Sequence, residues 1–419
     1  MDDLTITTTT HVQARWVLGA MEEMATWARM KFKPAKSRCL IMKKGQVSKR
    51  FNLKIQGENI PSIADNPIKC LGQWYDDTLK DTNNIRRLEQ ETSERLVNID
   101  KTGLPGKYKT WIFQHGLLPR LIWPLMLYDI PMTTVEGLER RVNRHLRRWM
   151  GVPQCFSSVG LYSKTAKLRL PLSSVVEEFK AGKARLIMTL KDSKDPKVRE
   201  AGAYIQSGRK WKATDAVLEA ESRLCHKDIV GTVCKGRQGL GNESTTRWQG
   251  ASTAERRQLI QQEIRLQEEE RRYTQAVEMG AQGNWTRWET EQRTLQWNEI
   301  WKYTPLQPQF LLRAVYDVLP TPTNLRTWGL TEDPACPLCS KPANLEHVLS
   351  SCQIALSQGR YRWRHDQVLK ALAHTLETER KKDRPHSEQP KMINFVRSCE
   401  ARKETATRRS EGILCTARD

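Results

Sequence analysis

The chain has 419 residues, of which 38% are hydrophobic and 28% are charged, so it is long enough for two or three folded domains. Its formal net charge of +21, from 69 Lys and Arg residues against 48 Asp and Glu residues, indicates a polyanionic partner. The most apolar run, residues 116–130, is short and contains Arg120 and two prolines, so we expect no membrane-spanning segment and no membrane partner.

The cysteine content and the N-terminus together indicate the cellular compartment. No secretory hydrophobic region is visible at the N-terminus, so we expect the protein in the nucleus or cytoplasm and not outside the cell. The ten cysteines are then expected to be reduced thiols or metal ligands instead of a disulfide framework.

The first 80 residues have an α+β pattern. Alternating β-branched residues predict a strand at 4–9, and residues 11–30 have helical spacing that Pro34 ends. Three further segments are expected to form strands around this helix: 38–44, a hairpin at 51–63 that turns at Gly57–Glu58, and 68–74.

From about residue 83 the pattern is helical, so we expect a predominantly α protein overall. A helix is predicted at 133–150, where Thr133 and Glu136 have the spacing of a capping box. Its apolar face comprises Val135, Leu138, Val142, Leu146 and Trp149. Further helices are expected at 83–99, 173–192, 195–223 and 253–279, and residues 234–252 have the composition of a linker.

The strongest chemical signal is a Cys-x2-Cys-x7-His-x4-Cys motif formed by Cys336, Cys339, His347 and Cys352. Two cysteines separated by two residues can bind one ion from a tight turn, and a later His and Cys can complete a tetrahedron. The sequence therefore predicts a structural Zn²⁺ ion with no open position for catalysis. Leu345, Val348 and Leu349 are expected to pack against this knuckle.

The other cysteines give weaker signals. Cys225, His226 and Cys234 lack a fourth ligand nearby, and we interpret them as incidental or buried side chains. Three more cysteines in apolar contexts are expected to lie in the core: Cys39, Cys70 and Cys155.

The predicted helix at 133–150 also has a strongly basic face, formed by Arg140, Arg141, Arg144, Arg147 and Arg148. Its only acidic residues, Glu136 and Glu139, lie near its start, so the arginines are not balanced along the helix. Guanidinium groups bind phosphate oxygens in pairs, so we expect this face to contact nucleic acid.

Several stretches together resemble reverse transcriptases of non-LTR retrotransposons, in the branch whose polyprotein ends in a restriction-like endonuclease. "MDDLTITTTT" resembles the end of the catalytic hairpin, and "IKCLGQW" resembles a strand near the primer, with Cys70 in place of the usual aromatic residue. "MATWARMKFKPAKSRCL" resembles a helix and loop of the palm, and residues 116–153 resemble the thumb. The region before the endonuclease is resembled by "FLLRAVYDVLPTPTNLRTWGL", the zinc motif and "GRYRWRHDQVL".

The resemblance implies RNA-directed DNA synthesis primed at a nicked target DNA, with RNA and DNA as partners. It assigns Asp2 and Asp3 as carboxylates that hold Mg²⁺ and Lys36 as a nucleic-acid contact in the palm. A second acidic pair, Asp76 and Asp77, lacks the strand–turn–strand setting and is interpreted as a turn.

The resemblance also implies that fingers, a third catalytic aspartate and an endonuclease lie outside this sequence. We therefore expect a C-terminal fragment whose metal site is incomplete and which does not polymerise by itself. The expected parts are a partial palm (1–82), thumb helices (83–155), a helical extension (156–232), a linker (233–252), a helical linker region (253–330), the CCHC zinc knuckle with a following helix (331–375) and a partly disordered tail leading towards the endonuclease (376–419).

Two other functions are consistent with the residues. One is a non-catalytic zinc-containing module that binds RNA or DNA, such as a domesticated remnant. The other is an interaction protein built on the helix at 253–279, but its apolar residues are few and do not maintain heptads, so a coiled coil is not expected.

Overall fold

A computed structural model describes residues 4–48, 51–70, 73–78, 80–201, 205–236 and 248–382. The chain divides into two compact units, Met1–Tyr316 and Asp317–Asp419. Both are mostly helical, and the strands are short and paired in twos, which confirms the prediction of a predominantly α protein with an α+β N-terminal part. Among the described residues no helix is both long and apolar enough to span a bilayer.

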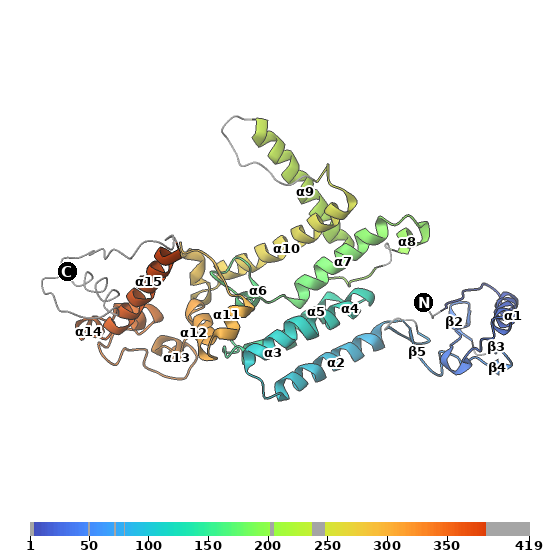
Figure 1. Ribbon diagram of the computed structural model, residues 1–419, viewed down its shortest axis with the longest axis horizontal. Helices are drawn as coiled ribbons and strands as arrows, with labels where there is room; N and C mark the ends of the chain where they lie inside the picture. The colour runs from blue at the N-terminus through green and yellow to red at the C-terminus, as the bar shows by residue number, and fades with distance from the viewer. Residues whose placement is uncertain are drawn as a thin grey trace. The chain divides into compact units, whose positions relative to one another are not determined.

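The described residues of the N-terminal segment form one α-helix, one short 3-10 helix and three antiparallel hairpins (Figure 1). The hairpin at 51–63 is confirmed, but it turns at Gln56–Gly57, where φ is +50° and +80°, one residue earlier than expected. A two-residue turn with positive φ at both positions matches the twist of paired strands. The elements are α1 (His11–Trp27), η1 (Pro34–Lys36), β1 (Met42–Lys43), β2 (Gln46–Val47), β3 (Lys54–Ile55), β4 (Glu58–Asn59), β5 (Ile68–Cys70) and β6 (Gln73–Tyr75).

Two strand predictions in this segment are wrong, and the strand expected at 38–44 is limited to Met42–Lys43. Residues 4–8 form no strand; instead the threonine run ends by capping α1, where the Thr10 hydroxyl accepts a hydrogen bond from the Gln13 N–H. The segment 68–74 forms most of a hairpin, β5 with β6, and not a single strand. Period-two patterns do not distinguish one strand from two short strands joined by a tight turn.

The helical part of the first unit is built around α7 (Val175–Lys191), which packs against α4, α5, α9 and α10 (Figure 1). The predicted apolar face of α5 is buried, with Val135, Leu138, Val142 and Leu146 all fully inaccessible. The helices here are α2 (Thr82–Lys101), α3 (Gly106–Ile112), η2 (Phe113–Leu117), α4 (Leu118–Leu127), α5 (Met132–Trp149), α6 (Val159–Tyr162), α8 (Pro196–Ala201), α9 (Ala213–Gly236), α10 (Thr253–Glu278), η4 (Ala281–Arg287), α11 (Trp297–Lys302) and α12 (Leu306–Val315). A parallel pair, β7 (Leu168–Arg169) with β8 (Arg293–Thr294), joins residues far apart in sequence.

Some local predictions for these helices fail. The helix expected at 195–223 is two helices, α8 and α9. The described residues between them, 205–212, are not helical, and the Ser207 hydroxyl accepts a hydrogen bond from the Ala213 N–H. Helix α5 begins after Pro131 without a side-chain cap, so the capping box at Thr133 is absent. A capping box does occur at Ser252 and Glu255, at the start of α10.

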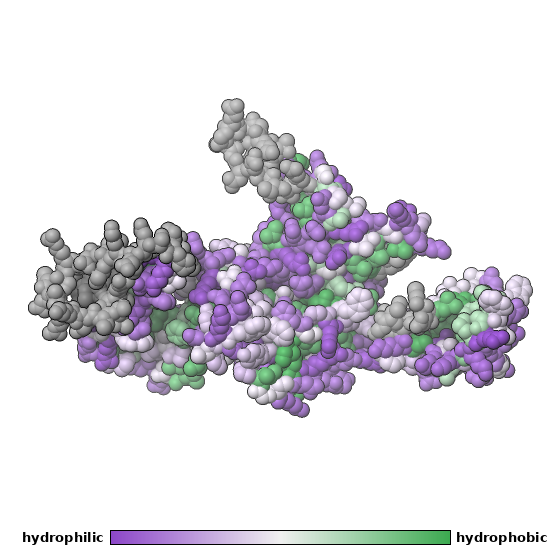
Figure 2. All heavy atoms as spheres, viewed as in Figure 1, coloured by the Kyte–Doolittle hydropathy of each residue, from purple (hydrophilic) through white to green (hydrophobic). Residues whose placement is uncertain are grey.

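The second unit contains the cysteine motif and its neighbouring helices. Its elements are α13 (Pro322–Thr327), η5 (His347–Ser351), α14 (Gln353–Ser357) and α15 (Arg362–Lys382). Most atoms on the viewed face of the molecule are hydrophilic, with hydrophobic residues gathered in patches, including one over the N-terminal segment at the right of the view (Figure 2).

The cysteines outside the motif have different environments. Cys155 is exposed, so the prediction that it lies in the core is wrong. Cys39 is half-buried, and Cys225 is half-buried against the cluster formed by α7, α9 and α10. The side chains of Cys70 and Cys234 lie outside the described residues.

Candidate metal centre and nucleic-acid interface

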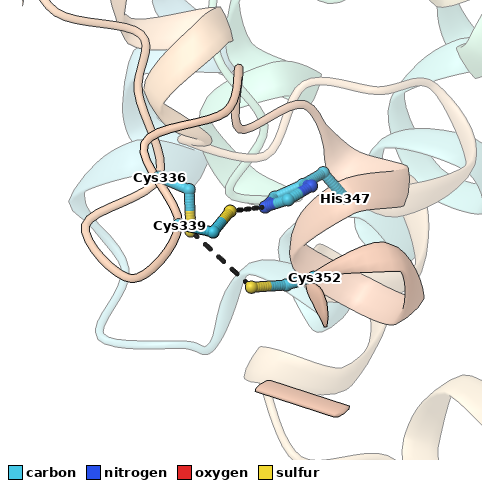
Figure 3. A group of neighbouring side chains, drawn as sticks. All are labelled: Cys336, Cys339, His347 and Cys352. Atoms are coloured by element: carbon cyan, nitrogen blue, oxygen red, sulfur yellow. Dashed lines mark hydrogen bonds between the residues drawn. The ribbon is translucent and has the colours of Figure 1, made fainter. Parts of the chain in front are cut away.

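Cys336 and Cys339 lie on a tight loop of the second unit. The Cys336 N–H donates to the Lys341 carbonyl at 2.7 Å, and the Ser340 N–H donates to the Cys336 carbonyl at 2.8 Å. Ala335 and Pro342 form an antiparallel bridge at the base of this loop. These contacts close the loop so that both thiols lie on the same side (Figure 3).

His347 and Cys352 come from the following helical segment. The Asn344 side chain accepts a hydrogen bond of 2.8 Å from the His347 N–H and so fixes the start of η5, which is a π-helix. Cys352 directly follows η5 and precedes α14. The loop and the helical segment therefore face each other with two candidate ligands each (Figure 3).

The four side chains form one cluster. All four candidate ligand atoms lie within 4.8 Å of one another. The Cys336 and Cys352 Sγ atoms are 4.0 Å apart, and the Cys339 Sγ lies 3.2 Å from the His347 Nε2. Zn–S bonds of about 2.3 Å in a tetrahedron place two sulfurs about 3.8 Å apart, so the spacing fits one ion.

The chemistry of the cluster also fits zinc. Three sulfurs and one imidazole nitrogen are a common donor set of structural zinc sites. The backbone N–H groups of Leu338 and Cys339 lower the pKa of Cys336 to about 6, which favours the thiolate form that binds metal. Cys336, His347 and Cys352 are buried, and four protein ligands leave no position for a substrate or water. The site is therefore suited to a structural ion.

The packing around the cluster differs from the prediction. Val348 is 43% exposed, so it does not cover the site, and Leu345 and Leu349 are only half-buried. The small residues Ala343 and Ala355 form the buried cluster with Cys336 and Cys352, and Leu338, Ile354 and Tyr361 pack against it. The sequence prediction selected large apolar side chains near the motif, and it therefore missed the two alanines that are buried against the cysteines.

The region around this cluster resembles a known domain. Residues 284–358 match a family model described as zinc-binding in reverse transcriptase. The chain contains a reverse-transcriptase-associated zinc-binding region. All four cluster residues lie within the matched span, so the match and the geometry agree on the same side chains. A comparison with curated proteins gave no match.

The five arginines of α5 have two different environments. Arg140 and Arg144 are exposed, and Arg148 is 60% exposed although its Nη1 contacts Asp100 at 2.9 Å. These three residues are spaced by four, so they form one row along the helix. We call them the arginine row.

The other two arginines bind other parts of the chain. Arg141 is half-buried against α2 and pairs with Glu89 at 3.3 Å. The Arg147 Nε donates to the Phe156 carbonyl at 2.7 Å, and burial lowers the pKa of Arg147. These contacts support the fold, and they leave the arginine row as the part of the predicted face that is open to a ligand.

The remaining predicted site residues lie in the N-terminal segment. Lys36 is exposed at the end of η1. Asp2 and Asp3, the proposed Mg²⁺ ligands, lie outside the described residues. The Asp76 carboxylate accepts hydrogen bonds from the Thr78 N–H and hydroxyl at 3.0 and 2.5 Å, which confirms the turn expected at Asp76–Asp77.

The sequence did not predict the residues that follow the cysteine motif and donate hydrogen bonds back to its backbone. The Tyr361 hydroxyl donates to the carbonyls of His347 and Val348 at 3.3 and 3.2 Å. Arg364 donates to the Leu349 carbonyl. The segment "GRYRWRH" at 359–365 was noted for its resemblance alone, and the alternation of aromatic and basic residues in it was the available signal.

Proposed function

We propose that this chain holds RNA or DNA as part of a reverse transcriptase of the non-LTR retrotransposon type. In this proposal the arginine row of α5 binds phosphates, and a structural Zn²⁺ ion at the Cys3His cluster keeps the zinc-binding region folded. Three exposed guanidinium groups at helical spacing on one face are the observation that supports phosphate binding. The net charge of +21 is consistent with it.

The reaction assigned to such enzymes is a separate part of the proposal. Nucleotidyl transfer requires Mg²⁺ ions held by carboxylates, and Asp2 and Asp3 are the residues that we propose for this role. We expect no primer extension by this chain alone. Extension that is lost in an Asp2→Asn/Asp3→Asn variant would overturn that expectation and would support the role of these carboxylates. Nucleic-acid binding that is unchanged in this variant and is not accompanied by extension would favour the non-catalytic binding module.

Binding by the arginine row is tested with an Arg140→Glu/Arg144→Glu variant. Binding of labelled RNA and duplex DNA is measured by fluorescence anisotropy over a series of salt concentrations. Loss of two phosphate contacts should weaken binding and lower the slope of log K against log salt by about 2. The slope of log K against log salt distinguishes a loss of phosphate contacts from a loss of affinity that has another cause.

The matched control is Lys197→Glu/Arg199→Glu, which makes the same change of charge on exposed residues of α8. This control should keep the slope of the unmodified protein. Equal slopes for both variants and the unmodified protein would contradict the assignment of the arginine row.

A further inference from the structure

Trp363 lies in the first turn of α15 and is 70% exposed. Arg360 and Arg362, which precede it in the sequence, are also exposed, and neither forms an ion pair with any residue that the structure describes. The Arg360 Nε donates to the neutral Gln358 side chain at 2.7 Å. A large aromatic ring and two uncompensated guanidinium groups therefore share one exposed segment, which we call the Trp363 platform.

The backbone under the Trp363 platform is fixed to the zinc-binding region. Tyr361 and Arg364, the neighbours of the platform residues, donate to three consecutive carbonyls of the segment 347–349. The guanidinium carbon of Arg364 also lies 4.6 Å from the centre of the Tyr361 ring. Tyr361 and Arg364 thus hold the segment in place, while Trp363 packs its ring against little of the protein.

The charge around the platform indicates what can cover it. Residues 357–370 contain four Lys and Arg residues and one acidic residue, Asp366. An exposed tryptophan by itself needs no explanation, but a tryptophan on a fixed, basic segment fits a partner that offers both a flat ring and negative charge. Unpaired nucleotides offer both, because each base has a π-face and each phosphate a charge.

We infer that the Trp363 platform binds single-stranded nucleic acid, with an unpaired base stacked on Trp363 and flanking phosphates bound by Arg360 and Arg362. This inference rests on the proposed function and deepens it: the second unit binds unpaired nucleotides, whereas the arginine row of α5 binds phosphates of any strand. The bases of a duplex are stacked on each other and cannot cover the ring, so the platform discriminates against duplex.

The test measures the affinity of the full-length, zinc-loaded chain for two probes by fluorescence anisotropy. One probe is an unpaired oligonucleotide of about 16 nucleotides, and the other is a duplex of the same length. Trp363→Leu should weaken binding of the unpaired probe roughly 5- to 100-fold, as expected for one lost base stack, and should leave duplex binding unchanged. Trp363→Phe keeps a ring and should restore most of the affinity.

The matched control is Trp123→Leu, which removes a tryptophan of α4 that is 62% exposed. It should bind both probes as the unmodified protein does, and the zinc content of all variants should be equal. The inference is overturned if Trp363→Leu binds the unpaired probe normally, or if it loses affinity for both probes equally. Self-association that disappears in Trp363→Leu would also overturn it, because a second copy of the chain would then be the partner.

The outcomes also separate this inference from the proposed function. If Arg140→Glu/Arg144→Glu weakens duplex binding while Trp363→Leu changes neither affinity, the proposed function stands and the Trp363 platform does not bind nucleotides. If the unmodified chain binds neither probe, both proposals fail.

Discussion

Glu177 of α7 and Arg272 of α10 form an ion pair of 2.6 Å, and the side chains of both residues are at most 5% exposed. Arg272 also lies 3.3 Å from Glu269, while the second oxygen of Glu177 pairs with Lys164 at 2.5 Å. Glu269 in turn accepts hydrogen bonds from the loop that contains Ser163 and Thr165. The interface between the two helices is therefore held by compensated charges as well as by apolar contacts.

Arg272→Met should destabilise the first unit by about 3–5 kcal/mol, because it removes the buried cation shared by Glu177 and Glu269, and only Glu177 keeps a second ion pair, with Lys164. Denaturant unfolding followed by circular dichroism measures the change. The control is Arg95→Ala, which breaks the exposed Glu91–Arg95 pair and should cost no more than about 1 kcal/mol. If both variants lower the free energy of unfolding by a similar, small amount, the buried ion-pair network contributes little to stability.

Purified protein should contain about one zinc ion per chain, and Cys336→Ser should remove most of it, because a structural site needs all four ligands. Elemental analysis measures the content, and limited proteolysis should show faster cleavage in the second unit. Cys155→Ser, at an exposed cysteine outside the cluster, should keep the full zinc content. An intact, protease-resistant protein without zinc would contradict the structural role of the ion.

Gly106→Ala should destabilise the first unit by about 1–3 kcal/mol, because a Cβ atom at this position would lie 1.8 Å from the Trp149 carbonyl oxygen. Helices α3 and α5 would have to move apart. Gly137→Ala on α5 is the control: its Cβ atom has ordinary contacts only, and it should stabilise the helix by roughly 0.5–1 kcal/mol. Thermal unfolding of both variants measures the change in stability, which should be negative for Gly106→Ala and positive for Gly137→Ala. A stabilising effect of both substitutions would show that the close contact between Gly106 and Trp149 is not required.

Lys183 should make the stability of the first unit depend on pH. Its Nζ donates to the carbonyls of Met126 and Tyr128, both at 2.8 Å, at the end of α4. Burial lowers the pKa of Lys183 to about 8, although Asp129 and Asp81 oppose the shift.

Between pH 8 and the ordinary lysine pKa of about 10.5 the unfolded chain therefore binds more protons than the folded chain, so this group makes the free energy of unfolding rise with pH. Lys183→Met should flatten that rise in denaturant curves recorded across this pH range. An unchanged rise in Lys183→Met would assign the pH dependence to other groups.

The zinc motif and the long amphipathic helices could be predicted from the sequence, because ligand spacing and periodicity are local properties. The bounds of α5 and α10 were close to those observed. The partners of individual charges could not be predicted: Arg141 and Arg147 bind residues of other segments, and nothing on α5 distinguishes them from Arg140. The buried acids of α10, including Glu263 and Glu269, were likewise indistinguishable from solvated ones.

The N-terminal segment was the least predictable part. Its strands are two or three residues long, so turn geometry determines them more than β-propensity does. Helix α1 was predicted, but its apolar side chains Trp16, Met24 and Trp27 are each at least 70% exposed, whereas periodicity normally marks a buried face. Within the described residues only Ala25 of this helix is buried.

The π-helical form of η5 has a consequence for the spacing of the ligands. Two side chains five positions apart on an α-helix project about 140° from each other around the helix axis and would therefore lie on different faces of the helix. The wider turn of a π-helix, in which residues five apart are hydrogen-bonded, lets His347 and Cys352, the residue that directly follows η5, place their candidate ligand atoms in one cluster. Removing one residue between them would convert the wide turn into a regular one, and inserting one would displace Cys352, so this stretch should tolerate substitutions far better than changes of length.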